Sequence, residues 1–135
     1  MFAQPLTASS TDPAQSAADA FYAFGYEMAA QERWSDASDV FRAMLLVCPT
    51  DERSWLGLGR CHDELGQSAV AIELYSLCIV AIPSAVRARV ALARQLRIAN
   101  RDVHAEQVLD VAGEIAESLE DDALLALVAR ARKES

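Results

Sequence analysis

Two adjacent residues near the middle of the chain, Cys61 and His62, are the first candidates for chemistry. A thiol beside an imidazole could form a nucleophile with its base, or two ligands of a metal ion. On a helix, however, neighbouring side chains point about 100 degrees apart, so these two do not converge on one atom. The sequence also lacks a glycine-rich phosphate loop, an HExxH pattern and a nucleophile elbow. We therefore expect no enzyme, no cofactor and no metal.

The charge balance narrows the range of partners. The chain has 20 acidic and 12 basic residues in 135, a net charge of -8. Nucleic acids and anionic membranes attract basic surfaces, so neither is an expected partner. The three cysteines form no CxxC pair and lie in apolar surroundings, which favours a reducing cytoplasm over a disulfide framework. The sequence has no apolar run long enough to predict a secretion signal or a membrane span.

A repeat of 34 residues organises the chain. Shifting the sequence by this length aligns aromatic with aromatic, small with small and proline with proline: Phe21 with Trp55, Phe24 with Leu58, Gly25 with Gly59, Ala37 with Ala71, Phe41 with Tyr75, and Pro49 with Pro83. Periods of this length are typical of solenoids, which bind along a concave surface more often than they catalyse. The aromatic and small positions are predicted to be core, with Trp55 and Leu58 packed inward.

Capping residues and helix breakers predict seven helices between the repeats' turns. The expected spans are Pro13 to about Gln31, Ser35 or Asp36 to about Val47, Thr50 or Asp51 to Gly66, Ser68 to about Ile82, Pro83 or Ser84 to near Asn100, Asp102 to about Ala116, and a last helix after a capping box at Ser118 and Asp121. Gly66 suits the left-handed position that ends a helix. The N-terminal stretch, rich in Ser, Thr, Ala and Pro, is expected to be flexible.

The third copy of the repeat is weaker, since Arg89 and Leu109 take the places of Trp55 and Tyr75. We predict an all-α solenoid of three helix-turn-helix repeats and a C-terminal capping helix. The predicted boundaries are a flexible segment at 1–12, repeats within 13–117 at about 18–51, 52–85 and 86–117, and the capping helix at 118–135.

The aligned residues match the tetratricopeptide repeat. The stretch from Trp55 to Cys61, with Gly66-Gln67 and the segment from Ala71 to Ser76, further resembles the class II chaperones of type III secretion, the SycD/LcrH/CesD-like family. The similarity covers roughly Ala18 to Glu117. Membership would imply a small cytosolic protein that keeps hydrophobic translocator subunits soluble before export, with an extended client segment held in the concave groove.

Helical phase indicates which residues face that groove, because residues one position after the inward-facing ones turn toward the concavity. The predicted peptide-binding residues are Tyr22, Tyr26, Leu56, Gly57, Arg60, Asp63, Val90, Ala91, Arg94 and Arg97. Tyrosine offers apolar area with a hydroxyl group, and Gly57 is expected to leave room for a bulky client residue. The same tyrosines could instead only shield the edge of the core.

Five arginines and no acidic residue lie between Val86 and Arg101. A client with acidic residues beside its apolar anchors could dock on them, or neighbouring helices could neutralise them through ion pairs. A carboxylate clamp of the Hsp70 and Hsp90 type is not expected, since Tyr22, Tyr26 and Gly57 replace its Lys and Asn donors. Two questions stay open: whether the chain forms a homodimer, and whether it is a general scaffold or adaptor instead of a chaperone.

Overall fold

The computed structural model describes residues 12–134, so the predicted flexible segment lies outside the described residues except for Asp12. This part of the chain folds into seven α-helices and no strand. The helices are α2 (Pro13–Ala30), α3 (Trp34–Val47), α4 (Glu52–Glu64), α5 (Ser68–Ala81), α6 (Val86–Ile98), α7 (Asp102–Ser118) and α8 (Asp122–Lys133). The all-α prediction and the helix order are confirmed.

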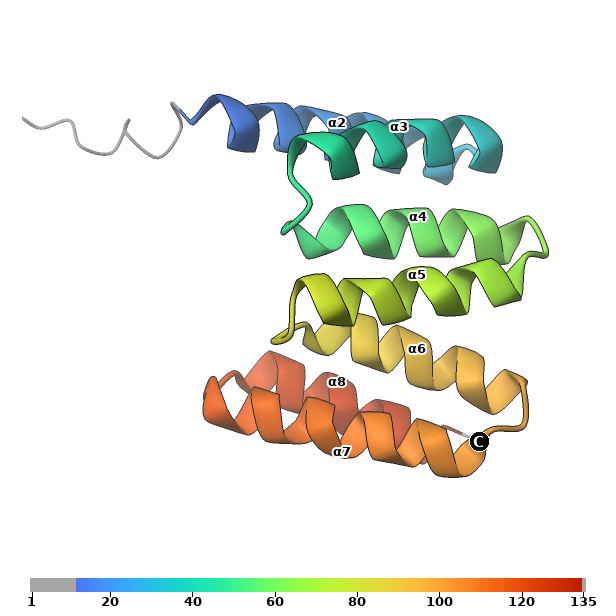
Figure 1. The fold of residues 1–135 in the computed structure, drawn as a ribbon, viewed down its shortest axis with the longest axis vertical. Coiled ribbons are helices and arrows are strands. Elements are labelled where there is room, and N and C mark those ends of the chain that lie inside the picture. The colour runs from blue at the N-terminus through green and yellow to red at the C-terminus, as the bar shows by residue number, and fades with distance from the viewer. Residues whose placement is uncertain (1–11, 135) are drawn as a thin grey trace, which may run out of the picture.

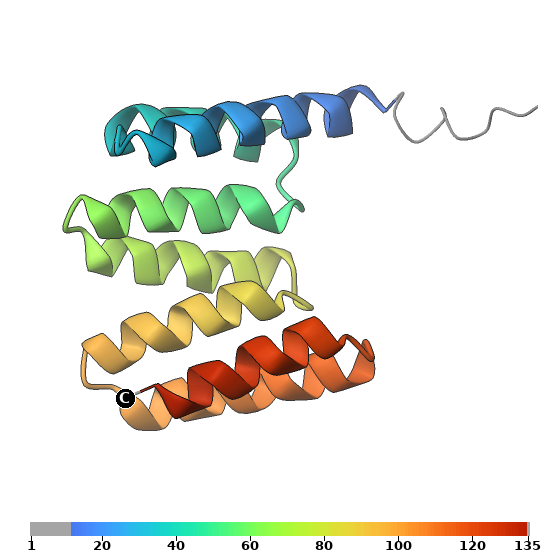
Figure 2. The ribbon, with the colours of Figure 1, turned by 180° about the vertical axis from the view of Figure 1, so that it is seen from behind.

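The helices stack as antiparallel hairpins in a column, as Figure 1 shows. Helices α2, α4, α6 and α8 each contact the next of that series, and α3, α5 and α7 lie on the opposite side. In Figure 2 the view from behind brings α2 and α8 in front of α3 and α7. The inner surface of the solenoid is therefore built from the first helix of each repeat and is closed at one end by α8.

The 34-residue period fixes the turns inside the hairpins. Glu32, Gly66 and Asn100 stand 34 positions apart, and each has a positive φ, of 58°, 79° and 61° respectively. The left-handed backbone at these positions ends the first helix of each repeat. The prediction for Gly66 is confirmed, and the same conformation recurs at Glu32 and Asn100 without glycine.

Side-chain caps appear where aspartate precedes a helix. Asp12, Asp51 and Asp121 accept hydrogen bonds from the backbone N–H groups of Ala14, Arg53 and Leu124. Other predicted starts were wrong: α3 begins at Trp34, α6 begins at Val86 and not at Pro83 or Ser84, and Ser118 ends α7 instead of capping α8.

In the first two repeats the aromatic residue of the second helix lies in the core, whereas the aromatic residues of the first helix are partly buried or exposed. Phe41 is 3% exposed and Tyr75 is 5% exposed, which confirms them as core residues. Phe24, by contrast, is 55% exposed, so its assignment to the core was wrong. Trp55 is only partly buried, and its indole N–H donates to the carbonyl oxygen of Pro49 at 2.9 Å. No helix within residues 12–134 is long and apolar enough to cross a membrane.

Candidate functional site

A hollow of about 430 Å³ opens on the inner surface between α2 and α4 and reaches the start of α6. Aromatic and apolar side chains form most of its wall, and three arginines stand among them. The lining residues are Tyr22, Tyr26, Ala29, Trp34, Phe41, Arg53, Leu56, Gly57, Arg60, Cys61 and Arg87. Five of the ten predicted groove residues therefore lie together: Tyr22, Tyr26, Leu56, Gly57 and Arg60.

Tyrosine side chains provide much of the apolar surface in this hollow. The ring centroids of Tyr22 and Tyr26 are 6.0 Å apart, one helical turn along α2, and the Tyr22 ring lies 6.4 Å from that of Phe41. Tyr26 is 62% exposed, whereas Tyr22 is partly buried. The exposed ring offers flat apolar area that loses little conformational entropy on contact with a ligand.

Arg53 is a lining residue that sequence analysis missed. Its guanidinium stacks 4.6 Å from the centroid of the Tyr22 ring and bonds Asp19 of α2 and Asp51 at 2.7 Å each. These hydrogen bonds hold the pKa values of both carboxyls below their usual range. The signal was available, because Asp19 and Arg53 stand 34 positions apart and so occupy neighbouring repeats at one height.

Trp34 is a second lining residue that was not predicted, because the expected helix began after it, at Ser35 or Asp36. The guanidinium of Arg60 lies 5.3 Å from its ring centroid, within cation–π range. Arg60 and Trp34 thus border the hollow at the end that is nearer the hairpin turns.

Gly57 makes room for the chain's own Phe41 and not for a client side chain as predicted. A Cβ placed on Gly57 would lie 2.6 Å from the Phe41 ring, and one on Gly25 would lie 2.8 Å from it. The ring therefore sits between two helices that approach closely only because both positions are glycine. The main chain at Gly57 still lines the hollow.

The predicted residues of the third repeat do not join the hollow. Val90 is 1% exposed in the core, so the prediction that it faces the groove is wrong. Ala91 packs partly buried against the same core cluster. Asp63 lies outside the lining and acts instead on buried Tyr75, whose pKa is raised to about 12 mainly by burial and further by this carboxylate. In the third repeat, the position equivalent to Gly57 is the bulkier Ala91, and the hollow does not continue there.

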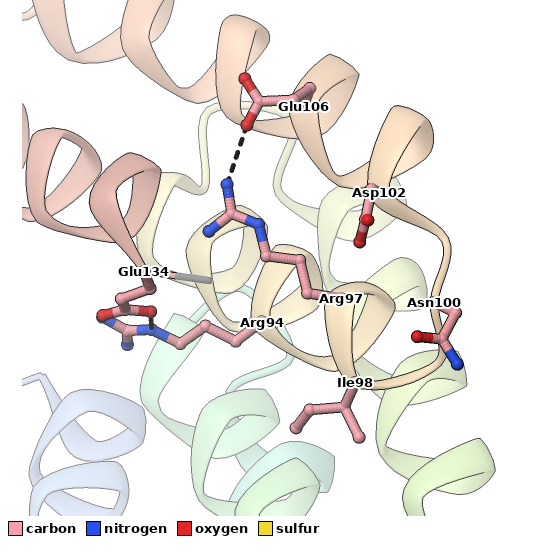
Figure 3. Close-up of a pocket in the computed structure, with 7 residues that line it drawn as sticks. All are labelled: Arg94, Arg97, Ile98, Asn100, Asp102, Glu106 and Glu134. Atoms are coloured by element: carbon pink, nitrogen blue, oxygen red, sulfur yellow. Dashed lines mark hydrogen bonds and ion pairs between the residues drawn. The ribbon is translucent and has the colours of Figure 1, made fainter.

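Arg94 and Arg97 face the end of α8 in a second hollow of about 660 Å³ (Figure 3). Arg94 donates two hydrogen bonds to the carboxylate of Glu134, at 2.8 and 2.9 Å. Arg97 bonds the carboxylate of Glu106 at 2.8 Å and the carbonyl oxygen of Ala131. Two of the five arginines between Val86 and Arg101 are thus neutralised by ion pairs within the chain, as the second alternative predicts.

The thiol and imidazole that first suggested chemistry point to different places. Cys61 is buried, and burial raises the pKa of its thiol to about 11, which disfavours the thiolate form that a nucleophile needs. The Nδ1 atom of His62 lies 2.6 Å from the side-chain oxygen of Gln67. Within residues 12–134, no three His, Cys, Asp or Glu side chains are grouped as metal ligands would be.

Several solved structures of type III secretion chaperones are similar to this chain. The translocator chaperone SycD of Yersinia enterocolitica superposes with a TM-score of 0.75 and 27% identity, over 84% of this chain and 85% of that one. PcrH of Pseudomonas aeruginosa, solved with the chaperone binding region of PopB, gives a TM-score of 0.74 and 28% identity over 84% of this chain and 90% of that one. By its structure the chain is similar to the SycD-like translocator chaperones.

Sequence comparison is consistent with a distant relationship to this family. Low calcium response locus protein H of Yersinia pestis is 34% identical over 55 residues, which is 41% of this chain, so the match spans about a third (33%) of that relative's length. No family model matches. The TPR2B domain of yeast Sti1 gives a TM-score of 0.68 at 22% identity over 84% of this chain and 97% of that one, a likeness of fold alone. The predicted tetratricopeptide fold of a SycD-like protein is confirmed.

Proposed function

We propose that this chain is a cytoplasmic chaperone of a type III secretion system that holds an extended segment of a hydrophobic translocator subunit in the hollow between α2 and α4. The observation that carries the proposal is an open hollow on the inner surface, with a wall formed by the aromatic side chains of Tyr22 and Tyr26 and the aliphatic side chain of Leu56. Its fold is the one in which PcrH was solved with the chaperone binding regions of PopB and of PopD.

The mechanism is stoichiometric binding. A translocator that must later enter a membrane exposes apolar segments, and these drive premature association in water. Covering such a segment against aromatic side chains removes that surface from water at little entropic cost to the chaperone, since Tyr22 and Arg53 are already held in place by each other. Release of the client is then the task of another component.

Co-expression tests this function. Each translocator gene of the native host is expressed alone, with this chain, and with the double variant Tyr26→Ala/Leu56→Glu. The wild type should convert an insoluble or degraded translocator into a soluble complex, and the variant should not. Leu77→Ala/Val80→Glu makes the same kinds of change at exposed positions of α5 and should rescue like the wild type.

The runner-up function, a scaffold or adaptor domain, predicts a different result. A scaffold would bind its partner without changing that partner's solubility, so soluble yield separates the two functions. Equal rescue by wild type and by Tyr26→Ala/Leu56→Glu, with unchanged helical circular dichroism, would contradict the assignment of the hollow. A homodimer, the other open prediction, is tested by sedimentation of the purified chain at several concentrations.

A further inference from the structure

Two rows of residues flank the apolar centre of the inner surface. Each row takes one position from α2, α4 and α6, spaced 34 residues apart. The central row is Tyr22 and Leu56, and the equivalent position of α6 is Val90, which is buried in the core. One flank is Asp19, Arg53 and Arg87, and the other is Tyr26, Arg60 and Arg94. Four of the six flanking positions are arginine in a chain whose net charge is -8.

Two of these arginines already bind carboxylates from distant parts of the chain. Arg53 of α4 donates a hydrogen bond to Asp19 of α2. Arg94 of α6 donates to both carboxylate oxygens of Glu134, which follows α8, and Figure 3 shows this second pair. A planar guanidinium and a carboxylate match as two parallel hydrogen bonds, which fixes orientation as well as adding binding energy. Arginines of the flanking rows can therefore bind carboxylates that come from another segment.

The remaining two arginines border the open hollow. Arg60 is 65% exposed and lies 3.9 Å from Glu64 of its own helix, a weak contact. Arg87 is exposed, and its guanidinium forms none of the ion pairs found within residues 12–134. The Glu52 carboxylate lies close enough to feel the charge of Arg87, but its hydrogen bond at 2.8 Å is with the backbone N–H of Ala88.

We propose that the hollow selects an extended client segment whose apolar anchor is flanked by acidic residues, with the anchor against Leu56 and the carboxylates on Arg60 and Arg87. This inference rests on the proposed function and adds the chemistry of the client to it. In an extended peptide successive side chains point to opposite faces, so acidic residues two positions before and after the anchor share its face and can reach the arginines on either side of the hollow. Because the chain's net charge repels an acidic segment at a distance, local pairing with these arginines is what makes such a client acceptable.

Matched peptides test the inference by fluorescence anisotropy. Three labelled peptides share a core of leucines separated by serine and differ only in the residues on either side, which are Glu, Gln or Lys. The wild type should bind the Glu peptide about tenfold more tightly than the Gln peptide at low salt, each arginine contributing about threefold. The preference should shrink as salt is added.

Charge variants assign that preference to the two arginines. Arg60→Gln/Arg87→Gln should bind the Glu and Gln peptides alike, and Arg60→Glu/Arg87→Glu should prefer the Lys peptide. Arg42→Gln/Arg130→Gln removes the same charge from exposed positions outside the hollow and should keep the wild-type preference.

The outcomes separate this inference from the function beneath it. Equal binding of all three peptides by the wild type would overturn the acidic preference. The groove would then recognise apolar side chains alone. Retention of the preference in Arg60→Gln/Arg87→Gln would likewise overturn it. If no peptide binds and no translocator is rescued in co-expression, the proposed function fails together with the inference.

Discussion

At the scale of single residues, Phe41 connects the core to the hollow. Its ring is buried between α2 and α4, yet one part of it lines the hollow beside Tyr22. The glycines on either side, Gly25 and Gly57, set how closely those two helices approach the ring. A change at either glycine therefore alters both stability and the shape of the hollow.

Gly57→Ala should lower the free energy of unfolding by about 1–3 kcal/mol, because the added methyl group would force the Phe41 ring to move. The double variant Gly57→Ala/Phe41→Leu should lose less than the sum of the single changes, since the smaller side chain leaves space. Urea unfolding measures all three. Gly113→Ala in α7 is the matched control: its Cβ would meet no atom closer than 3.8 Å, so we expect a gain of about 0.5–1 kcal/mol. Additive losses would show that Gly57 and Phe41 do not share one space.

Phe41→Ala should destabilise the chain more than Trp55→Ala. The first change empties a nearly fully buried site and should cost about 3–5 kcal/mol. The second removes a partly exposed ring and one hydrogen bond to Pro49, and should cost about 1–2 kcal/mol. Sequence reasoning had put Trp55 in the core. The reverse order of unfolding midpoints would restore that prediction.

At the scale of elements, α6 depends on α4 for its N-terminus. Its N-cap residue, Ala85, has no side chain able to accept a hydrogen bond, and the Glu52 carboxylate from α4 bonds the Ala88 N–H instead. Burial is the main cause of the raised pKa of Glu52. One repeat thus caps the next, which ties the register of neighbouring hairpins to a single carboxylate.

Glu52 gives a prediction about pH. Since its pKa in the folded chain is above the ordinary 4.5, its contribution to stability is greatest below that value and is lost as pH rises through the folded pKa. Gln does not titrate but can still accept the Ala88 N–H. The stability of Glu52→Gln relative to wild type should therefore increase as pH rises from about 4 to 7.

Glu52→Ala is the comparison that isolates the cap. It loses the acceptor and should be about 1 kcal/mol less stable than Glu52→Gln at neutral pH. Urea unfolding at a series of pH values measures both variants. A pH-independent difference between Glu52→Gln and wild type would contradict the raised pKa.

The helices were predictable from sequence because local signals define them. The 34-residue period and the aspartate caps at Asp12 and Asp51 placed helices within a few residues. The cap of α6 was not predictable, because its acceptor comes from 36 residues away. The hollow was half predictable. Helical phase correctly placed Tyr22 and Leu56 in it. Val90 is instead buried in the core and Arg94 bonds Glu134, and the phase of a single helix cannot reveal such tertiary contacts.

At the scale of the whole molecule, the core is uneven. The larger cluster runs through α5 to α8 and contains Tyr75, Leu96 and Leu109, whereas a smaller one joins α2, α3 and α4 around Phe41 and Met44. In a solenoid each repeat is stabilised mainly by its neighbours, so the end with the smaller core opens first. The hollow lies at that end.

Hydrogen exchange tests this gradient. Amide protons of α2 should exchange faster than those of α6 and α7, and binding of a client should slow exchange in α2 more than in α7. Uniform exchange across all helices, before and after client is added, would contradict the gradient.

The central claim is that the client lies on the inner surface at the hollow. Two variants carry the photoreactive residue benzoylphenylalanine. In one it replaces Tyr26 of the hollow, and in the other it replaces Leu77 on the opposite side; both positions are exposed. After irradiation of complexes purified from the native host, position 26 should yield a covalent adduct with the client and position 77 should not. An adduct from position 77 with none from position 26 would contradict the account.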